Sequence, residues 1–211
     1  EEIYSDIKEL NNKILLSKPK KNSSWKMRGL NHQNFLGNIY LPSANDLFLK
    51  RKVGKDKFSI YTSVTPLLAL NKNLIFSDDT GTIFYTNGQG KTIWKKNIYK
   101  KIYKKVYKNL VFSIFEDNLY VADNIGFVYS VSLNNGQINW IKNYGVPIKS
   151  NIKIFNNKIF LIDQDNKIIS LSTVDGSLIW DILTISSFIK TQNLLSIAIS
   201  DVGDLFAITS S

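Results

Sequence analysis

Residues that could carry catalysis or hold a metal are few in this chain. The 211 residues include a single histidine, His32, and no cysteine. The sequence therefore cannot form disulfides, thiolate metal sites, cysteine nucleophiles or a site with several histidine ligands. We predict a protein that is not an enzyme and that needs no metal or cofactor, with His32 as a surface or packing residue.

Two short stretches begin like ligand-binding loops but lack residues that such loops need. The stretch "NGQGKT" at 87–92 ends like a phosphate-binding loop, but that loop has a glycine five residues before its Gly-Lys-Thr, where this chain has Tyr85. The stretch "DQDNK" at 163–167 lacks the later glycine and the bidentate glutamate of a calcium loop. We interpret both as turns between strands.

The most basic stretch is "NIYKKIYKKVYKNL" at 97–110, in which lysines alternate with tyrosines and aliphatic residues. On a helical wheel its lysines fall on one half and its apolar residues on the other, as in a helix that lies on a membrane surface. Three turns are marginal for an isolated helix. A net charge of +10 by itself favours an anionic partner, but lysine, asparagine and isoleucine are abundant throughout the chain, so we interpret the charge as a solvated surface rather than a nucleic-acid site. We favour a connection packed on the rim of the fold and keep the membrane-surface helix as the alternative.

An internal repeat gives the frame that must position these residues. Glycines lie four residues before tryptophans in three successive units, as Gly90–Trp94, Gly136–Trp140 and Gly176–Trp180. The tryptophans are 46 and 40 residues apart, which is typical of the blades of a β-propeller. We predict that each tryptophan is largely buried between neighbouring blades and joins them.

Turn residues divide each unit into four short strands. Asp78, Asp123 and Asp163 stand in register, and three residues after each comes Gly81, Gly126 or Asn166, which tolerate the positive φ of tight turns. In the second unit we predict strands at 110–115, 119–122, 127–132 and 137–141.

Partial units flank the three complete ones. Residues 46–54 are similar to a last strand, with Leu49 at the tryptophan position, and residues 194–209 to the first two strands of a fourth blade. The fold class is therefore all-β, a propeller of four-stranded antiparallel blades. We expect the N-terminal half of a larger ring, about three and a half blades.

These repeats resemble those of pyrroloquinoline-quinone-type propellers. The stretch "WKMRGLNHQN" at 25–34, followed by "DDTGTIFYTNGQGKTIWKKNI" at 78–98, resembles the BamB family, lipoproteins of the machine that assembles outer-membrane β-barrels. The resemblance covers residues 25–211. It implies an eight-bladed, non-catalytic scaffold in the periplasm of a Gram-negative bacterium, peripheral to the outer membrane, which binds the barrel-forming, BamA-like subunit through blade-rim loops.

The resemblance also implies a tether and a partner site. Residues 1–24 would be the tether, with a short helix carrying Ile3, Ile7, Leu10 and Ile14 on one face, and the lipidated cysteine would lie outside this chain. The closest match to the family's partner loop is Phe188, Ile189 and Lys190, for which ordinary rim packing is an equal interpretation.

Two alternatives remain open within the same fold. One is a fragment of a quinoprotein dehydrogenase, although the adjacent cysteine pair of those enzymes is absent. The other is a general protein- or polymer-binding propeller, which uses the same blade rims.

Overall fold

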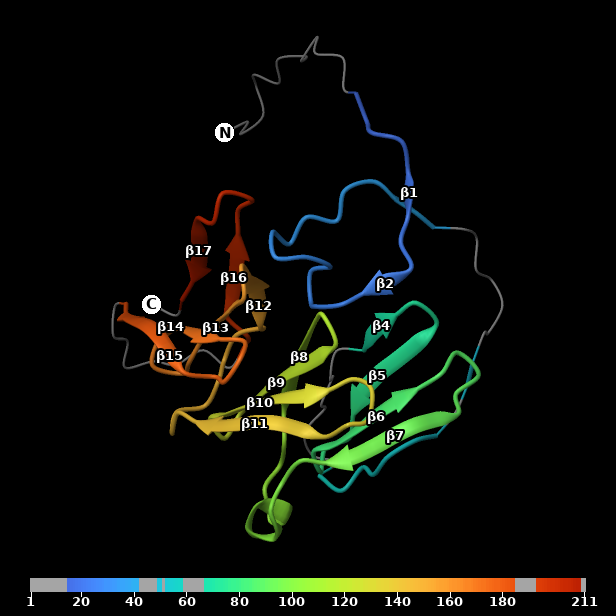
Figure 1. Ribbon diagram of the computed structural model, residues 1–211, viewed down its shortest axis with the longest axis vertical. Coiled ribbons are helices and arrows are strands. Elements are labelled where there is room, and N and C mark those ends of the chain that lie inside the picture. Colours follow the sequence, from blue (N-terminus) through green and yellow to red (C-terminus); the bar gives the residue numbers. More distant parts are fainter. Residues whose placement is uncertain (1–14, 42–48, 51, 59–66, 185–192, 210–211) are drawn as a thin grey trace, which may run out of the picture.

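The structure is a computed structural model that describes residues 15–41, 49–50, 52–58, 67–184 and 193–209. Within these residues nearly all of the regular structure is β, and the helical part is the five-residue 3₁₀ helix η1 (Lys101–Lys105). Three sheets and a hairpin follow one another around an arc (Figure 1). This arrangement confirms the predicted β-propeller, present as part of a ring.

Each of the three sheets is antiparallel and keeps its strands in sequence order. The first blade consists of β2 (Ser24–Trp25), β4 (Leu68–Leu70), β5 (Asn73–Ser77), β6 (Thr82–Thr86) and β7 (Thr92–Asn97). The second consists of β8 (Leu110–Phe115), β9 (Asn118–Asp123), β10 (Phe127–Ser132) and β11 (Ile138–Asn143). The third consists of β12 (Lys153–Phe155), β13 (Lys158–Ile162), β14 (Lys167–Ser172) and β15 (Leu178–Leu183). The fourth is the hairpin of β16 (Ser196–Ile199) and β17 (Leu205–Ile208), and a separate parallel pair joins β1 (Lys20–Lys21) to β3 (Ile39–Tyr40).

The strands of the second blade confirm the predicted turn positions, with boundaries that agree to within two residues. The prediction of a blade-like last strand at 46–54 is wrong for its described part, since residues 49–50 and 52–54 lie in no strand. The first blade instead gains a fifth strand, β2, which pairs with β4 through Trp25 and Ala69. Ser24, the last residue of the expected tether, thus takes part in the first blade, where it pairs with Leu70.

The core lies between successive blades because each strand presents alternate residues to its two neighbours. On β8, Leu110 and Phe112 pack in a cluster with the first blade, whereas Val111 packs in a cluster with the third. A third cluster joins the third blade to β16. Burial of apolar surface stabilises a fold by about 25 cal/mol per Å², so these clusters hold each blade to the next.

The first strand of each blade lies innermost. The first strands of the second, third and fourth blades approach one another, β8 with β12 and β12 with β16. β8 is buried along almost its whole length, whereas the last strand of its blade, β11, is mostly exposed. In a propeller the innermost strands surround the central channel, so the edges of β4, β8, β12 and β16 mark its side of the molecule.

Candidate functional site

The predicted tryptophans lie on the last strand of each blade and reach the following blade. The indole Nε1–H of Trp94 donates to the Leu133 carbonyl (2.7 Å), and that of Trp140 donates to the Thr173 carbonyl (3.1 Å). On each of the three tryptophan strands a β-bulge places one extra residue, Ile93, Asn139 or Ile179, directly before the tryptophan and re-aims the side chains there. Trp94 and Trp140 therefore join the first blade to the second and the second to the third.

The glycines of the repeat leave room for these indoles. A Cβ atom on Gly136 would lie 2.9 Å from the Trp94 ring, and one on Gly176 would lie 2.7 Å from the Trp140 ring. Gly90 has the same positive φ as these two glycines. All three tryptophans are partly buried rather than largely buried, because they stand on the outermost strand; Trp180 packs against Phe160 of its own blade at a centroid distance of 6.0 Å.

The repeated aspartates hold the turn between the second and third strands of each blade. Asp123 Oδ1 accepts hydrogen bonds from the backbone N–H groups of Ile125, Gly126 and Phe127 at 2.8–2.9 Å. Asp78 and Asp163 accept backbone hydrogen bonds in the same positions. These carboxylates are therefore turn residues, as predicted for "DQDNK", and no group of three metal-ligating side chains occurs among the described residues.

Residues 24–35, here named the crossing segment, run across the innermost strands of all four blades. β2 pairs with β4 of the first blade. The next residue, Lys26, accepts a hydrogen bond at its backbone carbonyl from the Ile114 N–H (2.7 Å) on β8. Further along, the His32 backbone carbonyl accepts a hydrogen bond from the Ile199 N–H (2.8 Å) on β16. The Asn34 side-chain amide donates to the Ile197 carbonyl (2.9 Å) on the same strand. The crossing segment therefore covers inner edges that would otherwise present unpaired backbone groups.

At the third blade a buried lysine makes the connection. Lys153, on β12, is 1% exposed, and its ammonium donates to the carbonyls of Arg28 (2.6 Å) and Asn31 (2.7 Å) and to Asn34 Oδ1 (2.6 Å). Burial, with a smaller contribution from Arg28, lowers the pKa of Lys153 to about 8. All three protons of the ammonium thus have acceptors in the crossing segment, as a buried cation requires.

The crossing segment is shaped by the residues that the sequence motif contains. Gly29 has φ +78°, and a Cβ there would lie 2.1 Å from Asn34 Oδ1. The Asn31 side chain bonds both the N–H (3.0 Å) and the carbonyl (2.7 Å) of Phe35. The His32 ring packs on Phe155 at 5.1 Å, which confirms its prediction as a packing residue.

The basic stretch at 97–110 fills the cleft between the first two blades with aromatic rings. The Tyr99 hydroxyl donates to Asp123 Oδ2 (2.5 Å), and its ring lies 6.1 Å from that of Tyr129. The Tyr103 ring lies 5.4 Å from that of Phe127. Burial first, and the neighbouring Asp123 second, raise the pKa of Tyr99, which stays protonated and remains a hydrogen-bond donor.

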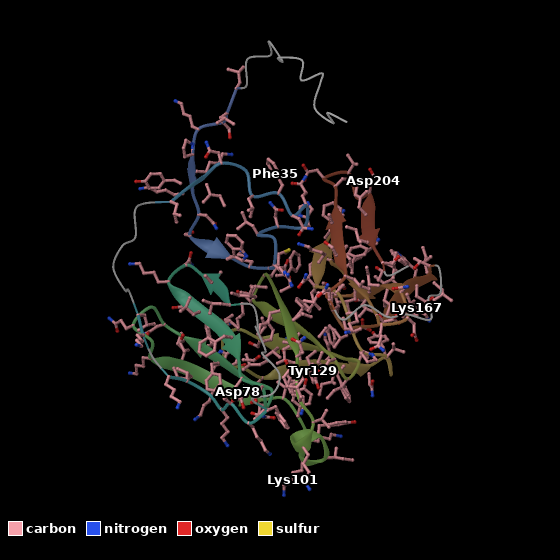
Figure 2. The ribbon with its side chains drawn as sticks, turned by 180° about the vertical axis from the view of Figure 1, so that it is seen from behind. Phe35, Asp78, Lys101, Tyr129, Lys167 and Asp204 are labelled. Carbon is pink, nitrogen blue, oxygen red and sulfur yellow. The ribbon has the colours of Figure 1, made fainter. Side chains whose placement is uncertain are left out.

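The amphipathic division expected of this stretch is wrong. Lys108 is buried, and its ammonium donates to the carbonyls of Tyr103 and Val106 and lies 4.8 Å from the Tyr99 ring centroid. Burial lowers the pKa of Lys108, against the opposing charges of Asp123 and Asp79. Ile102 and Val106, expected on the packed face, are 77% and 45% exposed, because the 3₁₀ helix projects beyond the blades (Figure 2, at Lys101).

The corresponding place in the first blade is hollow. Asp78 and Phe84 occupy the positions in the first blade that Asp123 and Tyr129 occupy in the second. The connection that precedes the first blade, segment 52–58, places lysines there, whereas the connection that precedes the second blade places Tyr99 and Tyr103. The hollow has a volume of about 450 Å³ and adjoins a second one of about 390 Å³. The side chains and backbone that line the two are Gly54, Lys55, Lys57, Asp78, Thr80, Thr82, Phe84, Lys95, Asn97 and Tyr99.

Comparison with solved structures finds propellers. The quinohemoprotein alcohol dehydrogenase from Comamonas testosteroni is similar over 77% of this chain and 27% of its own, at a TM-score of 0.56 and 13% identity. The computationally designed Ika4 protein matches over 77% of this chain and 100% of its own (TM-score 0.51, 11% identity), and BamB from Moraxella catarrhalis over 59% and 36% (TM-score 0.49, 12% identity). The fold is that of a β-propeller.

This chain spans about a third of the length of that BamB and a smaller share of the dehydrogenase. No protein-family model matches the sequence, and no curated protein matches it. At identities of 11–13% the solved structures bear on the fold and leave the function to the residues of this chain.

The site residues predicted from the sequence fall into two groups. Trp94 meets Gly136 and Trp140 meets Gly176 at the blade junctions, whereas Phe188, Ile189 and Lys190, like the helix expected at 1–14, lie outside the described residues. Sequence reasoning missed the roles of Lys153 and Lys108, since a buried lysine has no sequence signal among 27 lysines and arginines. The tyrosines that interrupt the lysines of the basic stretch were the available sign that part of it packs against the fold.

Proposed function

We propose that the chain is part of a non-catalytic scaffold propeller that binds protein partners through its blade rims. The observation that carries this proposal is the crossing segment on the innermost strands. Because these strands surround the central channel, the chain's own backbone covers the side from which they would hold a small ligand. Partner binding is then left to the outer strands and the loops of the rim.

The repeated carboxylates support the same conclusion. A quinone enzyme of this fold would need carboxylates free to coordinate calcium, whereas Asp78, Asp123 and Asp163 already accept backbone N–H groups in their turns. A carboxylate that binds these donors cannot leave them without exposing unpaired N–H groups. The turn aspartates therefore serve the fold.

The scaffold we propose is the BamB kind that the sequence motif resembles. Its partner would be the barrel-forming subunit of the outer-membrane assembly machine, its location the periplasmic side of the outer membrane, and its anchor a lipid outside this chain. Within the described residues no helix is long and apolar enough to cross a membrane. Residues Phe188, Ile189 and Lys190 are the proposed contacts, an apolar pair beside a cation.

Two titrations test this function. Pyrroloquinoline quinone with calcium should leave the melting temperature of the chain unchanged, and a saturable rise would support the dehydrogenase instead. The soluble region of a barrel-forming subunit should bind the chain, and the combined change F188A/I189A/K190A should weaken binding at least tenfold. The matched control is V174A/L178A/K158A, also two apolar residues and a lysine, all exposed on the third blade; equal loss in both variants would contradict the assignment of the loop.

A further inference from the structure

The rim of the first blade carries a basic surface that ends in an exposed aliphatic tip. We define the basic surface by six exposed lysines: Lys55, Lys57, Lys95, Lys100, Lys101 and Lys105. Lys55 and Lys57 line the same hollow as Tyr99, from which the projection with η1 begins, and Lys95 lines the adjoining hollow. The Phe58 ring packs on Tyr107 at 6.3 Å, so segment 52–58 and the base of the projection are in contact.

Negative charge is sparse on this surface. Residues 95–108 contain no acidic residue, and segment 52–58 contains one, Asp56. Asp78 is half-buried and accepts hydrogen bonds from Thr80, Thr82 and the Lys55 N–H. The positive charge of the exposed lysines is therefore largely uncompensated on this surface and available to an anionic partner.

The tip of the projection adds apolar character to this charge. Ile102 is 77% exposed and stands between Lys101 and Lys105, and Val106 is 45% exposed. The base of the same connection is anchored by the buried Ile98, Tyr99 and Lys108, so the tip is held away from the blades. Figure 2 shows Lys101 there, at the opposite end of the molecule from Phe35.

We propose that this basic surface docks on an anionic lipid bilayer, with headgroup phosphates at the lysine-lined hollows and Ile102 in the interfacial layer. Lysines around an apolar side chain are the composition of membrane-surface segments, and each lysine near such a surface strengthens binding about fivefold. An acidic protein is the competing occupant, and the polyglutamate measurement below distinguishes it from a bilayer. The inference does not depend on the proposed scaffold function, because the proposed partner contacts at 188–190 are not among the residues that define the basic surface.

Sedimentation with lipid vesicles tests the docking surface. The full chain should bind phosphatidylcholine vesicles that contain phosphatidylglycerol, should bind pure phosphatidylcholine weakly, and should lose most of its binding as salt rises toward about 0.5 M. Changing Lys100, Lys101 and Lys105 to glutamine should weaken binding about a hundredfold, since three lysines at about fivefold each are removed. Changing Ile102 to serine should weaken it severalfold even at low salt.

Matched variants separate this surface from general charge. K18Q/K20Q/K21Q removes the same number of exposed lysines from the N-terminal part, and V174S removes an aliphatic side chain that is 83% exposed on the third blade. Both should bind vesicles like the unchanged chain. Three results would each overturn the proposal. They are equal losses in the two lysine variants, no binding to anionic vesicles, and binding to polyglutamate that is as tight as binding to vesicles and is unaffected by I102S. Circular dichroism of every variant confirms the fold, and unchanged partner capture by K100Q/K101Q/K105Q keeps the result separate from the scaffold function.

Discussion

Replacing Trp140 by alanine should lower the free energy of unfolding by about 3 kcal/mol. Large-to-small changes of aromatic residues in a core cost about 3–5 kcal/mol, and the lower end applies because the indole is partly exposed on β11. The Nε1–H bond to Thr173 contributes about 1 kcal/mol of this. The acceptor is not left unpaired, because the Thr173 carbonyl also accepts the Tyr120 hydroxyl at 3.2 Å.

Urea unfolding followed by far-UV circular dichroism measures this loss, since the signal does not depend on the removed fluorophore. W140F keeps an aromatic ring and loses mainly the hydrogen bond, so it should cost less than half as much as W140A. I141A, the next residue on the same strand and 44% exposed, is the matched control and should cost less than about 1 kcal/mol. In thermal unfolding, W140A should melt about 6–12 °C lower.

A double-mutant cycle with Gly176 examines the junction itself. In G176A the new Cβ would lie 2.7 Å from Trp140 Cζ3 at a φ of +70°, so both steric overlap and backbone strain destabilise the variant. In W140A/G176A the overlap with the indole is gone, whereas the backbone strain and the 2.9 Å approach of the new Cβ to Lys142 Cγ remain. The double variant should therefore be more stable than the sum of the single changes by about 1 kcal/mol. Additive costs, or a W140A cost no larger than that of I141A, would refute the inter-blade role of the tryptophan.

Two further changes test the buried polar groups. D123A should cost about 3 kcal/mol because it leaves backbone N–H groups of the turn unpaired, and D123N, which keeps one acceptor oxygen, should cost less than half of that in the same urea assay. Burial lowers the pKa of Lys153 to about 8 in the folded chain, below its value of about 10.4 when unfolded. Unfolding therefore takes up protons between these values, and the unfolding free energy should rise with pH from about 8 to about 10. K153M should lack this contribution to the rise, and equal pH profiles for the two proteins would contradict the assignment.

The blades could be predicted from the sequence because their determinants are local. Asp123 caps a turn formed by the next four residues, and Gly126 provides the positive φ within it, so both leave a pattern that recurs at the blade period. The Gly–Trp spacing is also local, although the contact it serves is not. Trp140 meets Gly176 of the next blade, and the repeat reveals that contact only because three successive blades carry both residues.

The buried lysines could not be predicted for the opposite reason. Lys153 and its acceptor Arg28 are 125 residues apart, and no repeated residue marks the place where the crossing segment meets the third blade. Lys108 lies in a lysine-rich stretch that is typical of solvent-exposed sequence. It is buried because Tyr99 and Tyr103 pack in the cleft between the first two blades and bring the connection with them. A helical wheel fails here, since a five-residue 3₁₀ helix does not place residues at the α-helical period.

The crossing segment explains how a propeller fragment can keep its blades in order before any ring closes. Packing between neighbours would hold each blade only to the next, whereas the crossing segment contacts β4, β8, β12 and β16 within a dozen residues. Contacts of this kind tie distant blades to one another and cover parts of their inner edges that could otherwise pair with a second chain. The outer strands and the connections then remain for partners, and the connections differ between the blades. Tyr99 and Tyr103 fill the cleft between the first and second blades, whereas the corresponding place in the first blade is a hollow lined by lysines. A repeated fold thus acquires a distinct binding surface wherever one connection departs from the others.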